Sequence, residues 1–148
     1  MEASFYHLTS SPLKKALPSL LEKAYENNMR SLVICNAENI NQLDDDLWTF
    51  SPTKFLPHGT EKPEIQPVFI TDKITDKNAN NGRQVLAITN GAEYDGSQSF
   101  EKLLDMFDGN SDEQLNAARK RWKLYKDAGY TLRYWKQDEK GAWSEKTA

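Results

Sequence analysis

The sequence predicts a single α/β domain in which helices cover both faces of a mostly parallel central sheet. Short β-rich apolar runs alternate along the chain with amphipathic stretches, an order that is typical of α/β proteins. The chain has 148 residues, a length that suits one domain, and it contains neither an internal repeat nor an interdomain linker. We therefore expect one domain over residues 1–136 and a polar C-terminal tail over residues 137–148.

The first elements are expected to form a βαβ unit. The run "SFYHL", residues 4–8, predicts a strand, and residues 9–12 supply a helix cap with proline in the first turn. Apolar residues recur every three or four positions over residues 13–27, which predicts a helix with one buried face. The run "SLVIC", residues 31–35, lacks polar alternation and predicts a strand covered on both faces.

The middle of the chain predicts a second helix and two more strands. Residues 36–48, "NAENINQLDDDLW", favour a helix that begins at an asparagine cap. Its consecutive aspartates, residues 44–46, point about 100° apart and cannot converge on one ion, so we interpret them as a solvated face. The runs "PVFIT", residues 67–71, and "QVLAIT", residues 84–89, predict strands.

The C-terminal part predicts two further helices and a last strand. The run "SFEKLLDMF", residues 99–107, favours a short helix because its apolar residues recur at a spacing of three and four. These apolar residues are Phe100, Leu103, Leu104 and Phe107. Residues 111–128 predict a long helix that begins at a polar cap and ends at Gly129. The run "YTLRYW", residues 130–135, predicts the last strand.

Composition favours a cytoplasmic protein without disulfides. The one cysteine, Cys35, has no partner for an internal bridge and lies in an apolar run, so we expect a buried thiol in a reducing compartment. The N-terminal residues lack the basic start and the apolar stretch of a signal peptide, and no run is long enough to span a membrane. We therefore expect no membrane contact.

The sequence offers little catalytic chemistry. Residues 7–15, the first strand-to-helix turn, contain no glycine, and neither G-x-G-x-x-G nor a P-loop occurs, so we expect no nucleotide-binding loop and no cofactor. His7 and His58 are the only histidines, and no C-x-x-C or H-E-x-x-H motif offers a metal site. We interpret His58 as a packing or hydrogen-bonding residue and assign no catalytic residue. The alternative, a small nucleotide- or metabolite-binding enzyme, stays open because sequence does not locate carboxylate pairs.

The segment "LWTFSPTKFLPHG", residues 47–59, combines large apolar side chains with two prolines that stiffen its backbone. Its apolar residues are Trp48, Phe50, Phe55, Leu56 and Pro57. These side chains either tuck under the domain or form an exposed patch of the kind that marks a partner site.

Charge is unevenly distributed along the chain. Residues 1–113 carry 10 Lys and Arg against 18 Asp and Glu, whereas residues 114–148 carry nine against four. The basic C-terminal part is a candidate contact surface for an acidic partner. Nucleic acid is a further possibility because aromatic residues alternate with the cations there, although the net charge of -3 argues against it.

The long helix places cations beside an apolar stripe. Leu115 and Trp122 belong to the stripe, and Arg119, Lys123 and Lys126 project next to it. This arrangement suits an acidic peptide with an apolar end, because arginine holds a carboxylate through two parallel hydrogen bonds and lysines attract acidic residues at longer range. The alternative is an ordinary solvated basic face above a core stripe.

At these residues the sequence resembles the chi subunit of bacterial DNA polymerase III. The matching segments keep the order and spacing of that family, although none is a catalytic signature. They are "FYHL" at residues 5–8, "LWTFSPTKFLPHG" at 47–59, "PVFIT" at 67–71 and "ARKRWKLYKDAGYTLRYW" at 118–135. The resemblance implies a non-enzymatic adaptor with a Rossmann-like three-layer fold and no bound nucleotide.

The resemblance also implies two partners. The chain would form a heterodimer with the small psi subunit, which links it to the clamp loader. It would also hold the acidic C-terminal tail of single-stranded DNA-binding protein, a tail that ends in phenylalanine, and so reach single-stranded DNA only indirectly. The psi contacts implied by the family are Trp48, Phe50, Phe55, Leu56 and Pro57.

The implied tail site lies on the long helix. Arg119 would grip the terminal carboxylate of the tail, and Trp122 would help to form the pocket for its side chain. Leu115 adds apolar surface, and a second basic contact would come from Lys123, from Lys126 or from elsewhere in the chain.

Overall fold

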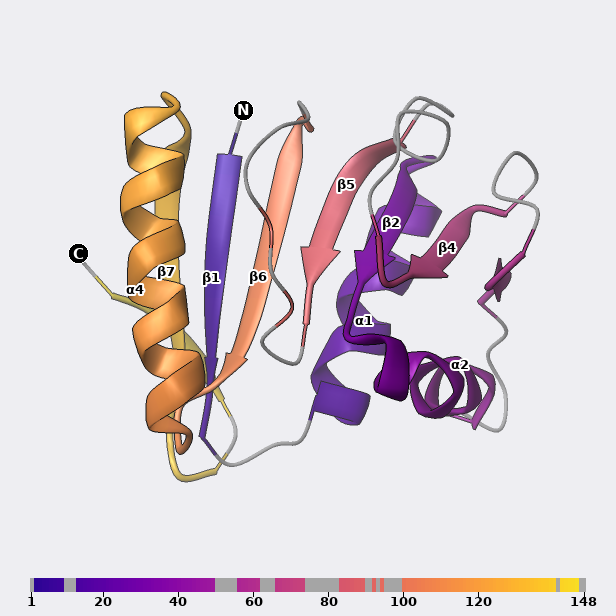
Figure 1. Cartoon of the computed structure of the whole chain (residues 1–148), viewed down its shortest axis with the longest axis horizontal. Coiled ribbons are helices and arrows are strands. Elements are labelled where there is room, and N and C mark those ends of the chain that lie inside the picture. The colour runs from indigo at the N-terminus through magenta and orange to yellow at the C-terminus, as the bar shows by residue number, and fades with distance from the viewer. Residues whose placement is uncertain are drawn as a thin grey trace.

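The structure, a computed structural model, describes residues 2–9, 13–49, 56–61, 66–73, 83–89, 92, 94, 100–140 and 142–146. Within these residues, eight strands form one sheet in the order β3-β4-β2-β5-β6-β1-β7-β8 (Figure 1). The strands are β1 (Glu2–Leu8), β2 (Arg30–Ile34), β3 (His58–Gly59), β4 (Val68–Thr71), β5 (Arg83–Ile88), β6 (Lys102–Asp108), β7 (Thr131–Gln137) and β8 (Trp143–Lys146). Neighbouring strands are parallel except for β7 and β8. The predicted α/β class with a mostly parallel sheet is confirmed.

Helices cover both faces of this sheet, as predicted. The helices α1 (Leu13–Glu26) and α2 (Ile40–Thr49) contribute to a core on one face. The helix α4 (Asp112–Asp127) packs on the other face, beside β1, β6 and β7 (Figure 1). A 3-10 turn, η1 (Ala37–Asn39), precedes α2, so the predicted second helix is divided into two pieces.

The two cores share the strands of the sheet through the alternation of side chains. Phe5 of β1 belongs to the core under α4, whereas its neighbour Tyr6 belongs to the core under α1 and α2. On the α1 side, Cys35 is buried directly after β2, and burial raises the pKa of its thiol to about 11, with a further rise from Asp72. The expectation that the thiol is a buried apolar group is confirmed.

The helix predicted over residues 99–107 is wrong, because this segment contains the strand β6. β6 lies between β5 and β1 and is covered on both faces, so all five residues from Leu103 to Phe107 are buried. Asp105, at the centre of the strand, is also fully buried and is paired with a helix residue. Because one polar residue interrupts the apolar run, the spacing of the apolar residues resembled that of an amphipathic helix. The local pattern therefore favoured the wrong structure.

The C-terminal residues add a strand that the sequence did not predict. β8 pairs antiparallel with β7, and Trp143 contacts Tyr6 at 5.4 Å between ring centroids. Residues 143–146 of the expected polar tail are therefore part of the sheet. Trp143 anchors β8 to the core under α1.

The long helix begins and ends as predicted. The Ser111 hydroxyl accepts a hydrogen bond from the backbone N–H of Gln114 at the N-terminus of α4. Gly129 follows the helix with φ at 89°, a conformation that glycine adopts without strain. The predicted cap of the first helix, at residues 10–12, lies outside the described residues. None of the described helices has the length and apolar character needed to cross a bilayer.

Candidate functional site

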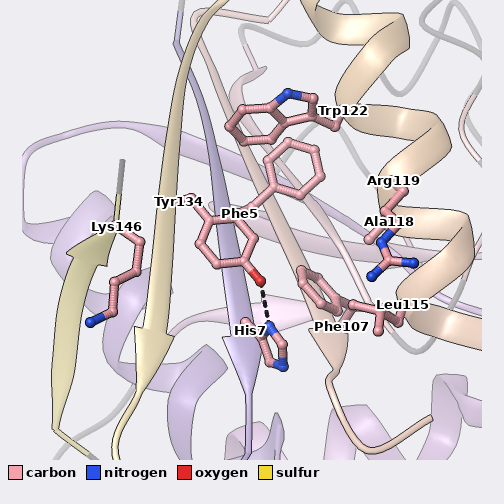
Figure 2. A pocket seen from close by; sticks show the side chains of 9 residues that line it. All are labelled: Phe5, His7, Phe107, Leu115, Ala118, Arg119, Trp122, Tyr134 and Lys146. Atoms are coloured by element: carbon pink, nitrogen blue, oxygen red, sulfur yellow. Dashed lines mark hydrogen bonds between the residues drawn. The ribbon is translucent and has the colours of Figure 1, made fainter. Parts of the chain in front are cut away.

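A cavity of about 570 Å³ lies between α4 and the strands β1, β6, β7 and β8 (Figure 2). Its lining residues are Phe5, His7, Phe107, Leu115, Ala118, Arg119, Trp122, Tyr134 and Lys146. Most of these side chains are apolar or aromatic, and two of them carry a positive charge. A cavity of this size and lining suits an apolar side chain that is attached to an acidic group.

Aromatic rings form the floor of the cavity. The ring of Trp122, from α4, lies 5.0 Å from that of Phe5 on β1 and 6.2 Å from that of Tyr134 on β7. The tilted and edge-to-face geometries of these pairs are ones that aromatic rings favour. Because β1 lies between β6 and β7, residues that are far apart in sequence meet on this floor.

Arg119 stands at the helix side of the cavity and remains exposed. Within the described part of the chain its guanidinium makes no ion pair, and its one hydrogen bond is a long one, 3.4 Å from Nη1 to Oδ1 of Asn116. A guanidinium that none of the described carboxylates engages is available to hold one from a ligand through two parallel hydrogen bonds.

His7 and Tyr134 share a hydrogen bond between the imidazole Nδ1 and the phenol at the base of the cavity (Figure 2). Burial lowers the pKa of His7; the positive charge of Lys136 lowers it further, and Asp108 opposes both effects. Burial also raises the pKa of the Tyr134 phenol. Around neutral pH we therefore regard this pair as uncharged, which keeps the base of the cavity suited to an apolar group.

The position of α4 depends on a buried ion pair that the sequence analysis missed. Arg121 of α4 donates two hydrogen bonds to Asp105 of β6, and the phenol of Tyr125 donates a third at 3.0 Å. Burial raises the pKa of Asp105, whereas the bonds from Arg121 and Tyr125 lower it. We regard the pair as charged because both carboxylate oxygens accept N–H donors. The polar residue inside the apolar run at 103–107 was the available signal.

The cavity brings together three of the five residues expected to bind a peptide tail. Leu115, Arg119 and Trp122 line it, while Lys123 and Lys126 are exposed on α4 and are not lining residues. Three aromatic residues and one histidine that join them, Phe5, Phe107, Tyr134 and His7, were not expected there. They come from three different strands, and their proximity follows from strand order rather than from local sequence.

The second expected surface surrounds Trp48. This residue lies in the last turn of α2, is 52% exposed, and its ring lies 4.5 Å from that of His58. The two ring nitrogens of His58 contact the backbone oxygens of Leu56 and Asp44, so His58 holds residues 56–59 against α2. The interpretation of His58 as a packing and hydrogen-bonding residue is confirmed.

Of the four other residues expected on this surface, the structure describes Leu56 and Pro57. Leu56 is 1% exposed and belongs to the core under α1 and α2. In the free chain its side chain therefore anchors residues 56–59 to this core. Pro57 is partly exposed beside it. Phe50 and Phe55 lie outside the described residues.

The fold and the cavity define a Rossmann-like α/β protein with an aromatic-lined pocket. Among the residues described, no group of three or more His, Cys, Asp and Glu is placed to hold a metal ion. Residues 1–133 match the family model described as DNA polymerase III chi subunit, HolC. The chain belongs to this family, as the resemblance in its sequence predicted.

A relative from Rickettsia prowazekii (strain Madrid E) agrees with this assignment. It is named probable DNA polymerase III subunit chi and is 33% identical to this chain over 90 residues. The match covers 58% of this chain and 53% of the relative, so this chain matches about half the length of the relative.

Proposed function

We propose that this chain is a non-catalytic accessory subunit of the DNA polymerase III holoenzyme that acts in DNA replication. In this role it bridges the psi subunit, and through psi the clamp loader, to the acidic C-terminal tail of single-stranded DNA-binding protein. Family membership supports the accessory role. The cavity beside α4 is the observation that carries the bridging proposal, because it combines aromatic lining with the exposed guanidinium of Arg119.

The terminal phenylalanine of the tail would enter the cavity. Leu115 and Trp122 offer apolar surface for its ring, and Arg119 holds the terminal carboxylate, which lies one bond from the Cα that carries this ring. A residue with a free carboxylate and an aromatic side chain therefore satisfies both features of the site at once. Lys123 and Lys126, exposed one and two turns further along α4, attract the acidic residues of the tail at longer range.

The psi subunit would bind the surface around Trp48. An exposed tryptophan that is held on one side by His58 presents a large apolar area at little cost in side-chain freedom. Pro57 lies in the same surface, and buried Leu56 supports it. The proposal extends this surface to Phe50 and Phe55 of the adjoining segment.

Calorimetry with a short acidic peptide that ends in phenylalanine tests the tail site. Arg119→Ala should weaken binding by more than about 1.5 kcal/mol, which is roughly tenfold, because it removes charge-assisted hydrogen bonds. Amidating the peptide terminus should weaken binding to the native chain by a similar factor and have little further effect on the variant. Equal affinities of the native chain and Arg119→Ala for the free-acid peptide would refute the assignment.

A further inference from the structure

We propose that β8 supplies a second cationic contact for the acidic tail through Lys146, on the side of the cavity opposite Arg119. The proposal rests on the proposed binding of an acidic, phenylalanine-ended peptide in this cavity. The family model ends at residue 133, so β8, at Trp143–Lys146, lies beyond the part of the chain that the model matches. This contact is thus a feature of the C-terminal strand of this chain.

Strand pairing puts Lys146 at the edge of the aromatic floor. In the antiparallel pair of β7 and β8, Lys146 lies opposite Tyr134, and in the parallel pair of β1 and β7, Tyr134 lies beside Phe5. The three residues share one face of the sheet, and all three line the cavity. Figure 2 shows Lys146 and Arg119 on opposite sides of the rings of Tyr134 and Phe5.

The charge of Lys146 is not balanced by the neighbouring acid. Glu145 precedes it on β8 but faces the other side of the sheet, where it lies 3.7 Å from Arg133. Within the described residues Lys146 itself makes no ion pair, and its side chain is exposed. Lys136, on the same face of β7, adds a second positive charge near the base of the cavity. This edge therefore attracts a carboxylate that comes from outside the chain.

The geometry sets where that carboxylate should lie in the peptide. Two interstrand spacings separate β1 from β8, which is about 10 Å, and an extended peptide advances about 3.3 Å per residue. With the terminal carboxylate on Arg119 and the terminal ring in the cavity, a side chain about three residues upstream reaches Lys146. The occupant that fits is an extended peptide with Asp or Glu at that distance from its terminal phenylalanine.

A cycle of two chains and two peptides tests this contact. Both peptides carry a free C-terminal phenylalanine, and they differ in having two Asp or two Asn at the third and fourth positions before it. Lys146→Gln should weaken binding of the Asp peptide about three- to fivefold, the upper part of the range for an exposed ion pair, and leave binding of the Asn peptide unchanged. Lys23→Gln, which removes an exposed charge from α1 on the other face of the sheet, is the matched control and should change neither affinity.

A second substitution of Lys146 and a third peptide extend the test. Lys146→Glu should weaken binding of the Asp peptide more than Lys146→Gln does, and moving the Asp pair six positions upstream should remove most of the difference between native chain and variant. If Lys146→Gln weakens both peptides equally or neither, the contact is refuted, while a loss of binding on Arg119→Ala would still support the tail site. If the native chain binds neither peptide, the proposed tail site fails, and the contact with Lys146 fails with it.

Discussion

Arg121 of α4 donates two hydrogen bonds to the buried carboxylate of Asp105 on β6, from Nε to Oδ2 at 2.5 Å and from Nη2 to Oδ1 at 2.9 Å. The bidentate contact fixes both the height and the rotation of α4 above the sheet. Arg119, two residues earlier on the same helix, is exposed at the cavity. The buried arginine thereby positions the exposed one.

Replacing Arg121 by methionine should destabilise the chain strongly. The change leaves Asp105, which is fully buried, without its counter-ion, and losses of about 3–5 kcal/mol are typical of such a broken pair. The free energy of unfolding, measured by urea denaturation, checks this expectation. Lys120→Ala, at an exposed position of the same helix, is the control and should change that free energy by less than about 0.5 kcal/mol.

The double variant Arg121→Met with Asp105→Asn separates loss of the pair from loss of packing. It removes the uncompensated charge, so it should recover part of the stability that Arg121→Met alone loses. If Arg121→Met alone were as stable as the native chain, the ion pair would not hold α4 in place.

His7 should make the stability of the chain depend on pH. Burial, assisted by Lys136, lowers its pKa from the ordinary value of 6.5, with Asp108 in opposition. Below about pH 6.5 the unfolded chain therefore binds more protons than the folded chain, and the free energy of unfolding decreases as the pH falls. We expect the stability difference between the native chain and His7→Leu to shift against the native chain between pH 7.5 and pH 5. A constant difference across that range, measured by denaturation, would contradict the expected titration.

Trp48→Ala should prevent co-purification with the psi subunit and leave the folded chain intact. Half of this side chain is already exposed, so its removal takes little from the core, whereas a partner loses its largest apolar contact. Tyr25→Ala on α1, a second exposed aromatic residue, is the matched control and should retain psi. Loss of the far-ultraviolet circular dichroism in Trp48→Ala would instead assign Trp48 a structural role.

Local patterns predicted most of the fold because most elements follow a local period. The helices α1 and α4 have one apolar face each, and β2 ends in an unbroken apolar run from Leu32 to Ile34. The prediction for β6 was wrong because a central strand covered on both faces has no alternation, and its one buried polar residue, Asp105, is explained only by its ion pair with Arg121. β8 was missed because its three polar residues look like surface sequence.

Only the part of the candidate site that lies on α4 could be predicted from the sequence. Arg119 and Trp122 are neighbours on α4 by helical spacing alone. His7, Tyr134 and Lys146 join them through the strand order, which places β1 between β6 and β7 and adds β8 at the edge. Sequence reasoning about one element does not contain that information.

The proposed bridging role requires that one chain holds both partners at once. The helix α4 covers one face of the sheet and α2 the other (Figure 1). The cavity lies beside α4, and Trp48 belongs to α2. Sedimentation of a fluorescent tail peptide with the purified complex of this chain and psi measures this directly. We expect the peptide to sediment with the complex, with the same dissociation constant as for the free chain. Release of the peptide when psi binds would contradict the bridging role.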